Sequence, residues 1–130
     1  MATLQANISL SSNNIITSST LAITVSKALT LDHGGVQRKK VIATSVGATA
    51  TTIYEADDFA AIAYIYIKNL DTTATDYIYV YDDTTSGDPV ILKLAGGDWA
   101  WLPTNADKTL KAYATTDPTH IEFGVFGSDQ

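Results

Sequence analysis

The clearest pattern along the chain is the alternation of apolar and polar residues with a period of two. In residues 62–68, alanine and isoleucine fill one set of alternate positions, and tyrosine and lysine fill most of the other. Residues 76–81 repeat the pattern, with Ile78 and Val80 on one side and three tyrosines on the other. Because successive side chains of a strand point to opposite faces, both segments are predicted to be strands with one apolar face.

These two segments can be aligned as an antiparallel hairpin. If Asn69 opposes Asp76, then Ile67 meets Ile78 and tyrosines meet tyrosines across the pair. A slip of one residue would place tyrosines opposite aliphatic side chains, so the pattern favours this register or one an even step away. The tyrosine face predicted in this way consists of Tyr64, Tyr66, Tyr79 and Tyr81.

Other short apolar segments follow one another along the chain, separated by Gly, Pro, Asp and Asn. The further predicted strands are 21–26, 37–46, 51–54, 89–94, 99–102, 109–114 and 120–126. Residues 57–61 are expected to form at most one helical turn. Eight or nine short strands need two packed sheets to hide their apolar faces, so we predict an all-β, two-sheet antiparallel β-sandwich, jelly-roll-like.

Composition supports this class and narrows the partners. Thr and Ala are the commonest residues, whereas the Leu, Glu and Lys that fill surface helices are scarce. With 130 residues, we expect a single domain over 1–130, in which the Ser/Thr/Asn-rich residues 1–20 form an extended N-terminal arm or an edge strand. The net charge of -6 argues against a nucleic-acid partner, and because no apolar run reaches membrane-spanning length, we expect neither a membrane partner nor a secretory signal. The absence of cysteine fits folding in a reducing cytoplasm.

Residues with catalytic or metal-binding chemistry are few and form no motif. The two histidines, His33 in a Gly-rich turn and His120 at a strand start, have no accompanying nucleophile motif, so we expect no enzyme, no catalytic residue and no cofactor. Acidic residues cluster at 55–58 and at 82–88. These clusters are either solvated loops between strands or weak calcium ligands, and no metal site is assigned.

Three groups of residues are candidates for binding. The tyrosine face is covered either by another part of the same chain or by a protein partner, since Tyr is enriched at interfaces. Arg38, Lys39 and Lys40 form the one basic run, which is either a solvated strand face or a docking site for an acidic surface. Trp99 and Trp101 share one strand face, either as core residues or, together with Tyr113, as an aromatic platform of a carbohydrate-binding module.

The order of segments over residues 60–126 carries a resemblance to a known family. The segments are AYIYIKNLD, DYIYVYDD, PVILKLAGGDWAWLP, LKAYA and HIEFGVF. This order resembles small virion structural proteins of tailed bacteriophages, including capsid decoration, or cement, proteins. The resemblance implies a β-sandwich on the capsid exterior, often a homotrimer, that binds the major capsid protein and stabilises the shell. A tail, fibre or baseplate component shares the same pattern and stays an alternative.

Overall fold

In the computed structural model, residues 2–13, 20–116 and 118–128 are described, and over these residues the chain is all β. Ten strands form in this part of the chain, and none of it is helical. None of the described segments, accordingly, is a helix with the length and hydropathy of a membrane span. The strands are β1 (Ala2–Ser12), β2 (Leu21–Leu31), β3 (Val36–Val41), β4 (Thr51–Tyr54), β5 (Ile62–Asn69), β6 (Ile78–Asp82), β7 (Val90–Leu94), β8 (Trp99–Asn105), β9 (Leu110–Ala114) and β10 (Thr119–Phe126).

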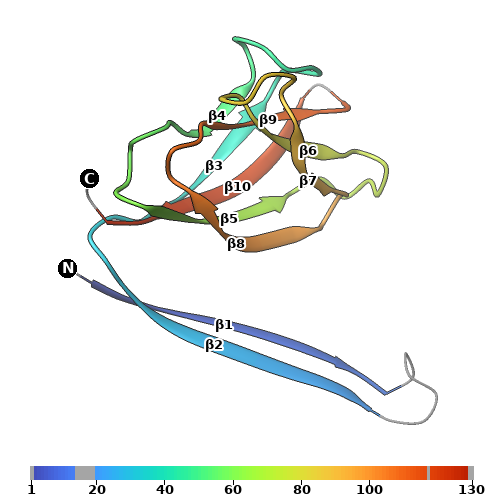
Figure 1. The fold of residues 1–130 in the computed structure, drawn as a ribbon. Helices are drawn as coiled ribbons and strands as arrows, with labels where there is room; N and C mark the ends of the chain where they lie inside the picture. Colours follow the sequence, from blue (N-terminus) through green and yellow to red (C-terminus); the bar gives the residue numbers. More distant parts are fainter. Residues whose placement is uncertain (1, 14–19, 117, 129–130) are drawn as a thin grey trace. The chain divides into compact units, whose positions relative to one another are not determined.

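The chain divides into two compact units between Leu31 and Asp32. The first unit is a two-stranded antiparallel ribbon made of β1 and β2 (Figure 1), here called the ribbon. Its register runs without a break from the pair Ala2–Leu31 to the pair Ser12–Leu21. The strand predicted at 21–26 is therefore confirmed and extends to Leu31. Of the predicted arm or edge strand at 1–20, β1 covers 2–12, while residues 14–19 lie outside the described residues.

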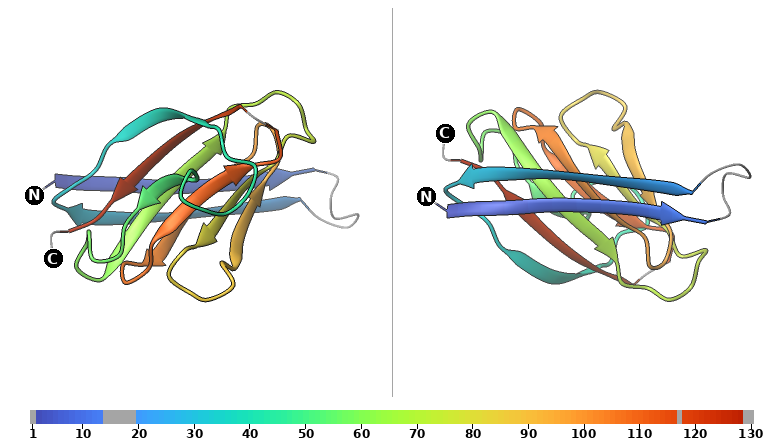
Figure 2. Two further views of the ribbon diagram at one scale, coloured as in Figure 1. Left: turned by 90° about the horizontal axis from the view of Figure 1, so that it is seen from above. Right: turned by 90° about the horizontal axis from the view of Figure 1, so that it is seen from below.

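The second unit is a sandwich of two four-stranded antiparallel sheets (Figures 1 and 2). One sheet, called the β5 sheet, has the order β3-β10-β5-β8, and the other, called the β6 sheet, has the order β4-β9-β6-β7. The pairs are nested, because β3 pairs with β10, β4 with β9, β5 with β8 and β6 with β7. A chain that doubles back on itself in this way and wraps into two sheets is a jelly roll. The predicted fold class is confirmed.

The core lies between the two sheets and is built from the apolar sides of the alternating strands. Its fully buried large aliphatic and aromatic side chains are Val41, Ile65, Ile67, Ile78, Val80, Ile121 and Phe123. Burial of each such side chain contributes about 1.5–3 kcal/mol, so this layer supplies much of the stability of the sandwich. In β4, a register shift between Thr52 and Tyr54 lets both Ile53 and Tyr54 face the core, which strict alternation does not allow.

The predicted hairpin between 62–68 and 76–81 is wrong. β5 pairs with β8 and β10, whereas β6 pairs with β7 and β9 in the opposite sheet. Ile67 and Ile78 therefore belong to apolar faces that meet across the core and are not neighbours along one face. Alternation determines which side of a strand is buried, but it does not determine which strand lies beside it, and a matched pattern fits both arrangements.

Candidate interaction surfaces

The ribbon has one apolar face and one polar face. Cross-strand partners share a face, so the register places ten aliphatic side chains and one cation together. This apolar ribbon face consists of Ala2, Leu4, Ala6, Ile8, Leu10, Leu21, Ile23, Val25, Leu29 and Leu31, with Lys27 opposite Ala6 and Ser12 opposite Leu21. Between them, facing the other way, lie Ser, Thr, Asn, Gln and Ala. Leu10 is 52% exposed, Ile23 46% and Val25 55%.

A ribbon of this kind is not self-sufficient. Two strands have no second layer to cover their apolar side, and isolated two-stranded hairpins are marginally stable in water. Along the apolar ribbon face, Leu29 and Leu31 are buried, whereas Leu10, Ile23 and Val25 form an exposed apolar patch. The ribbon is therefore a candidate interaction surface, centred on Leu10, Ile23 and Val25.

The outer side of the β5 sheet carries a second apolar surface, here called the aromatic face. The pairing of β5 with β8 and β10 places Tyr64, Tyr66, Trp99, Trp101 and Phe126 on this side. Tyr64 and Trp101 stack with ring centroids 6.0 Å apart and planes 17° from parallel, and Trp101 lies 5.6 Å from Phe126. Trp99 and Trp101 thus share a face as predicted, and this face is outside the sandwich core. Trp99 is 53% exposed.

Glycines make room for Phe126 on this face. A Cβ at Gly34 would collide with the Phe126 ring, and a Cβ at Gly124 would come within 2.6 Å of the Gly35 carbonyl oxygen and 2.9 Å of the ring. Both neighbours are held in place, one by the backbone and the other by packing on Trp101. Gly124 is therefore needed because there is no room for a Cβ atom, and not because the backbone adopts a conformation that only glycine tolerates.

Gly124→Ala is expected to lower the free energy of unfolding by about 1–3 kcal/mol, because overfilling a tight site forces backbone shifts. The matched control is Gly35→Ala on the neighbouring strand segment, where an added Cβ meets nothing within 4 Å. Urea denaturation of the two variants measures the difference. Equal midpoints for Gly124→Ala and Gly35→Ala would contradict this explanation.

A charged row borders the aromatic face. Arg38 Nε donates to Glu122 Oε2 at 2.9 Å, and the Tyr66 hydroxyl donates to Glu122 Oε1 at 2.9 Å. These two hydrogen bonds, that of Arg38 first, hold the pKa of Glu122 below its usual value. Burial and then the bond to Glu122 raise the pKa of Tyr66. The pair keeps a carboxylate beside the rings, but Arg38 is largely exposed, so the pair adds little stability.

The basic run has an explanation in the sheet. Arg38, Lys39 and Lys40 lie on β3, which pairs with β10 on one side and forms an edge of the β5 sheet. All three are exposed. Cations on an edge strand discourage pairing with a strand of another chain. Arg38 and Lys40 point to the same side as Glu122, and Lys39 points to the opposite side.

The predicted tyrosine face does not exist as one surface. Tyr64 and Tyr66 lie on the aromatic face, whereas Tyr79 lies on the outer side of the β6 sheet, stacked on Tyr113 with centroids 5.1 Å apart. Tyr81 is fully buried and accepts a hydrogen bond from the Gly47 amide at 3.3 Å. Tyr81 cannot contact a partner, because it packs under Ala43 and Ala50 of the loop after β3. The cause is again that β5 and β6 belong to different sheets.

A smaller aromatic cluster therefore occupies the β6 sheet. Tyr77, Tyr79 and Tyr113 lie on its outer side, and Lys93 Nζ lies 4.0 Å from the centroid of the Tyr77 ring. A cation over a ring face is favourable by about 0.5–1 kcal/mol at exposed sites. Because Tyr113 belongs to this cluster, it cannot extend a platform formed by Trp99 and Trp101.

The acidic clusters serve turns and ion pairs. Asp82 accepts hydrogen bonds from the Thr84 amide at 2.8 Å and the Thr85 hydroxyl at 2.6 Å, and Asp83 pairs with Lys111 at 2.7 Å. In the other cluster, Asp58 accepts from the Glu55 amide at 2.9 Å. Within 2–13, 20–116 and 118–128, no group of three or more His, Asp or Glu side chains is arranged to hold a metal ion.

Asp82 makes the stability of the sandwich sensitive to acid. Burial alone raises the pKa of Asp82, but hydrogen bonds from Thr85 and Thr84, with Lys108 nearby, outweigh it and lower the pKa below its usual 3.8. A lowered folded-state pKa gives stability that is present above the unfolded value and is lost as the pH falls through the folded value. Asp82→Asn is therefore expected to be less stable than wild type at pH 7, with a difference that starts to shrink below about pH 4 and disappears as the pH falls through the lower folded-state pKa. Melting curves between pH 2 and 7 test this, and a gap independent of pH would contradict it.

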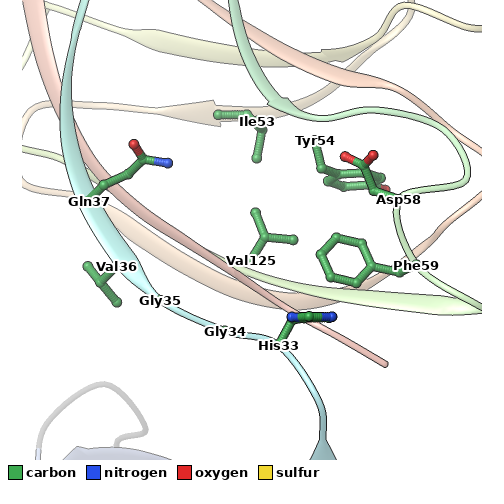
Figure 3. Close-up of a pocket in the computed structure, with 10 residues that line it drawn as sticks. All are labelled: His33, Gly34, Gly35, Val36, Gln37, Ile53, Tyr54, Asp58, Phe59 and Val125. Carbon is green, nitrogen blue, oxygen red and sulfur yellow. The ribbon is translucent and has the colours of Figure 1, made fainter. Parts of the chain in front are cut away.

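A pocket of about 440 Å³ opens at one edge of the sandwich, between β3 and β4. Figure 3 shows the side chains of Ile53, Tyr54, Phe59 and Val125 around a common space, with His33 at its rim. The Tyr54 hydroxyl donates within the sandwich, to Thr104 Oγ1 at 2.8 Å and to the Asn105 carbonyl at 3.0 Å. Burial is the main cause that raises the pKa of Tyr54. The pocket is an opening at the edge of the core, lined by these apolar side chains and by the polar side chains of His33, Gln37 and Asp58.

The two histidines lie apart in the second unit. His33 forms a backbone bridge with Gly127, and His120 lies on β10 opposite Lys40. Two features of the candidate interaction surfaces were not predicted from the sequence. They are the apolar ribbon face and the glycines that leave space for the Phe126 ring. The first had a signal, because Ala2, Leu4, Ala6, Ile8 and Leu10 alternate strictly with polar residues.

Comparisons with known proteins give no family. No family model matches the chain, and no curated protein matches it. Among solved structures, one that resembles the chain is a protein of Bacillus endospore appendages, described as a novel family of disulfide-linked pili. The two are 14% identical, the alignment covers 78% of this chain and 96% of that chain, and the TM-score is 0.44. A likeness at this TM-score carries no argument about function.

Proposed function

We propose that this chain is a non-enzymatic structural protein of a phage particle, and more specifically a capsid decoration protein that binds the major capsid protein on the virion exterior. The observation that carries the proposal is the ribbon. It presents eight large aliphatic side chains on one face, and two strands cannot bury that face by themselves. A protein built around such an arm works by assembly. The resemblance of residues 60–126 to small virion proteins supports the phage setting.

The proposed mechanism is mass action. A protein that binds the assembled shell and not its free subunits stabilises the shell by its binding free energy. Assembly on the particle buries aliphatic side chains that are exposed in the free chain, such as Leu10, Ile23 and Val25, at about 1.5–3 kcal/mol each, and association costs about 4–15 kcal/mol. Burial of several of them is enough to offset that cost. Many copies on one lattice then multiply a modest contact.

Fractionation of the virion that encodes the chain tests this function. DNA-filled heads without tails and free tails are separated, and the protein is quantified in each by mass spectrometry. The proposal predicts the protein on heads, in numbers that scale with the copies of the major capsid protein. Recovery with tails alone would assign it to the tail, fibre or baseplate, and absence from both fractions would end the proposal.

A further inference from the structure

The aromatic face is apolar well beyond its rings. The register adds Val36, Pro103 and Ile62 to the same side of the β5 sheet, next to Trp101 and Tyr64. Val36 is 57% exposed and Ile62 47%. The outer side of a sandwich sheet is commonly polar, since alternate residues face water. This side instead has an apolar end, which is suited to bind a third layer, next to a charged row of Arg38, Glu122 and Lys68.

We infer that the third layer is the ribbon of a second copy, so that the protein assembles by exchanging its arms. In this arrangement, the apolar ribbon face of one copy lies on the aromatic face of the next. The inference names the partner of the arm on which the proposed function rests. It makes the assembled form a closed homo-oligomer, either two copies that exchange arms reciprocally or a ring of three.

The position of Lys27 favours this occupant over a second ribbon, because aromatic rings accommodate a cation. Lys27 is the one charged residue among residues 1–31, whereas all 14 acidic residues of the chain come after residue 31. Two ribbons stacked by their apolar faces would bring two Lys27 side chains into the same apolar layer. The aromatic face instead offers ring faces on which a cation can lie, and its own cations, Arg38, Lys40 and Lys68, lie in the rows with Glu122 and His120.

The junction between the units favours exchange between copies. The ribbon ends at Leu31, and the next amides already belong to the sandwich, since Asp32 N and His33 N donate to the Gly127 carbonyl at 3.1 and 2.9 Å. Gly127 N donates back to the His33 carbonyl at 3.1 Å. No slack residue therefore separates the two units, and short hinges of this kind promote domain swapping.

The contact area is adequate. A ribbon of eleven residues per strand is about 36 Å long and two strands are about 10 Å wide, so one arm covers about 360 Å² on each partner. Each copy gives one arm and receives one. Each copy then buries about 720 Å² of its own surface, and two copies that exchange arms reciprocally bury about 1,400 Å² in total, which is within the range of stable interfaces.

The test uses purified full-length protein without capsids. Light scattering across concentrations is expected to give two or three times the chain mass of 13.9 kDa. Six Gly/Ser residues inserted after Leu31 give the arm slack to fold back, and are expected to raise the dissociation midpoint at least about 100-fold. The control carries the same insertion between Ser86 and Gly87, in the loop before β7, and stays oligomeric. Melting curves establish that both variants fold.

Each outcome decides the inference. A wild-type chain that is monomeric at about 100 µM overturns arm exchange, and so does an oligomer that the hinge insertion leaves unchanged. Because no capsid is present, the result is independent of the proposed function. If the protein is a monomer but is found on phage heads, the proposed function stands and arm exchange is wrong. If it exchanges arms but is absent from virions, arm exchange stands and the proposed function is wrong.

Discussion

Replacing Asn69 by aspartate is expected to lower the free energy of unfolding by at least about 3 kcal/mol. Asn69 is fully buried at the end of β5. Its Nδ2 donates to the carbonyls of Asp76 at 2.7 Å and Leu94 at 3.1 Å, and its Oδ1 accepts from the Asp71 amide at 3.0 Å. A carboxylate keeps the acceptor, but it faces two carbonyl oxygens without a proton to donate.

The chain offers a matched control for this change. Asn105 is exposed, and its Oδ1 accepts from the Asp107 amide at 2.9 Å, as a carboxylate oxygen can do equally well. Asn105→Asp is therefore expected to change stability by less than about 0.5 kcal/mol. Urea denaturation of both variants gives the comparison. Similar losses of stability in the two variants would contradict the claim that the buried hydrogen bonds of Asn69 stabilise the fold.

The second large effect is expected in the ribbon. Ile8→Asp places a charge in the middle of the apolar ribbon face, opposite Val25, and is expected to weaken self-association at least about 100-fold. Ser9→Asp adds the same charge to the polar face, one residue away, and is expected to leave association nearly unchanged. Sedimentation measures both. Equal weakening by the two variants would mean that net charge, and not the apolar face, controls assembly.

Both ribbon variants should leave the sandwich intact. The second unit has its own core, centred on Ile65, Ile67 and Phe123. Its melting transition is therefore expected within a few degrees of wild type in Ile8→Asp. This keeps the association measurement interpretable, because a loss of binding then reports on the arm alone.

The sequence was enough to predict the class of the fold and the buried side of its strands. Alternation around Ile65 and Val80 marks their burial, because the strand period is two. The sequence pattern did not determine which strands pair with each other. The pairing is nested and joins residues that are far apart along the chain, such as Arg38 and Glu122. For this reason a well-matched hairpin between β5 and β6 was predicted where the chain builds two opposed sheets.

The candidate surfaces were predicted in part. Trp99 and Trp101 share a face in the predicted way, because they are two residues apart on one strand. The grouping of Tyr64 with Tyr81 failed, since it depended on the hairpin. The role of Gly124 has no local signal at all, because it follows from a ring and a carbonyl that only the folded sheet brings near.

The most direct trial of the account is to mix the purified protein with bare, expanded capsids. If the chain is a capsid decoration protein, we expect saturable binding in a fixed ratio to the major capsid protein and greater resistance of the shell to heat. Ile8→Asp should bind far more weakly than Ser9→Asp in the same assay. No saturable binding of the wild-type chain, at concentrations where it is folded, would contradict the claim that its working part is an assembly surface.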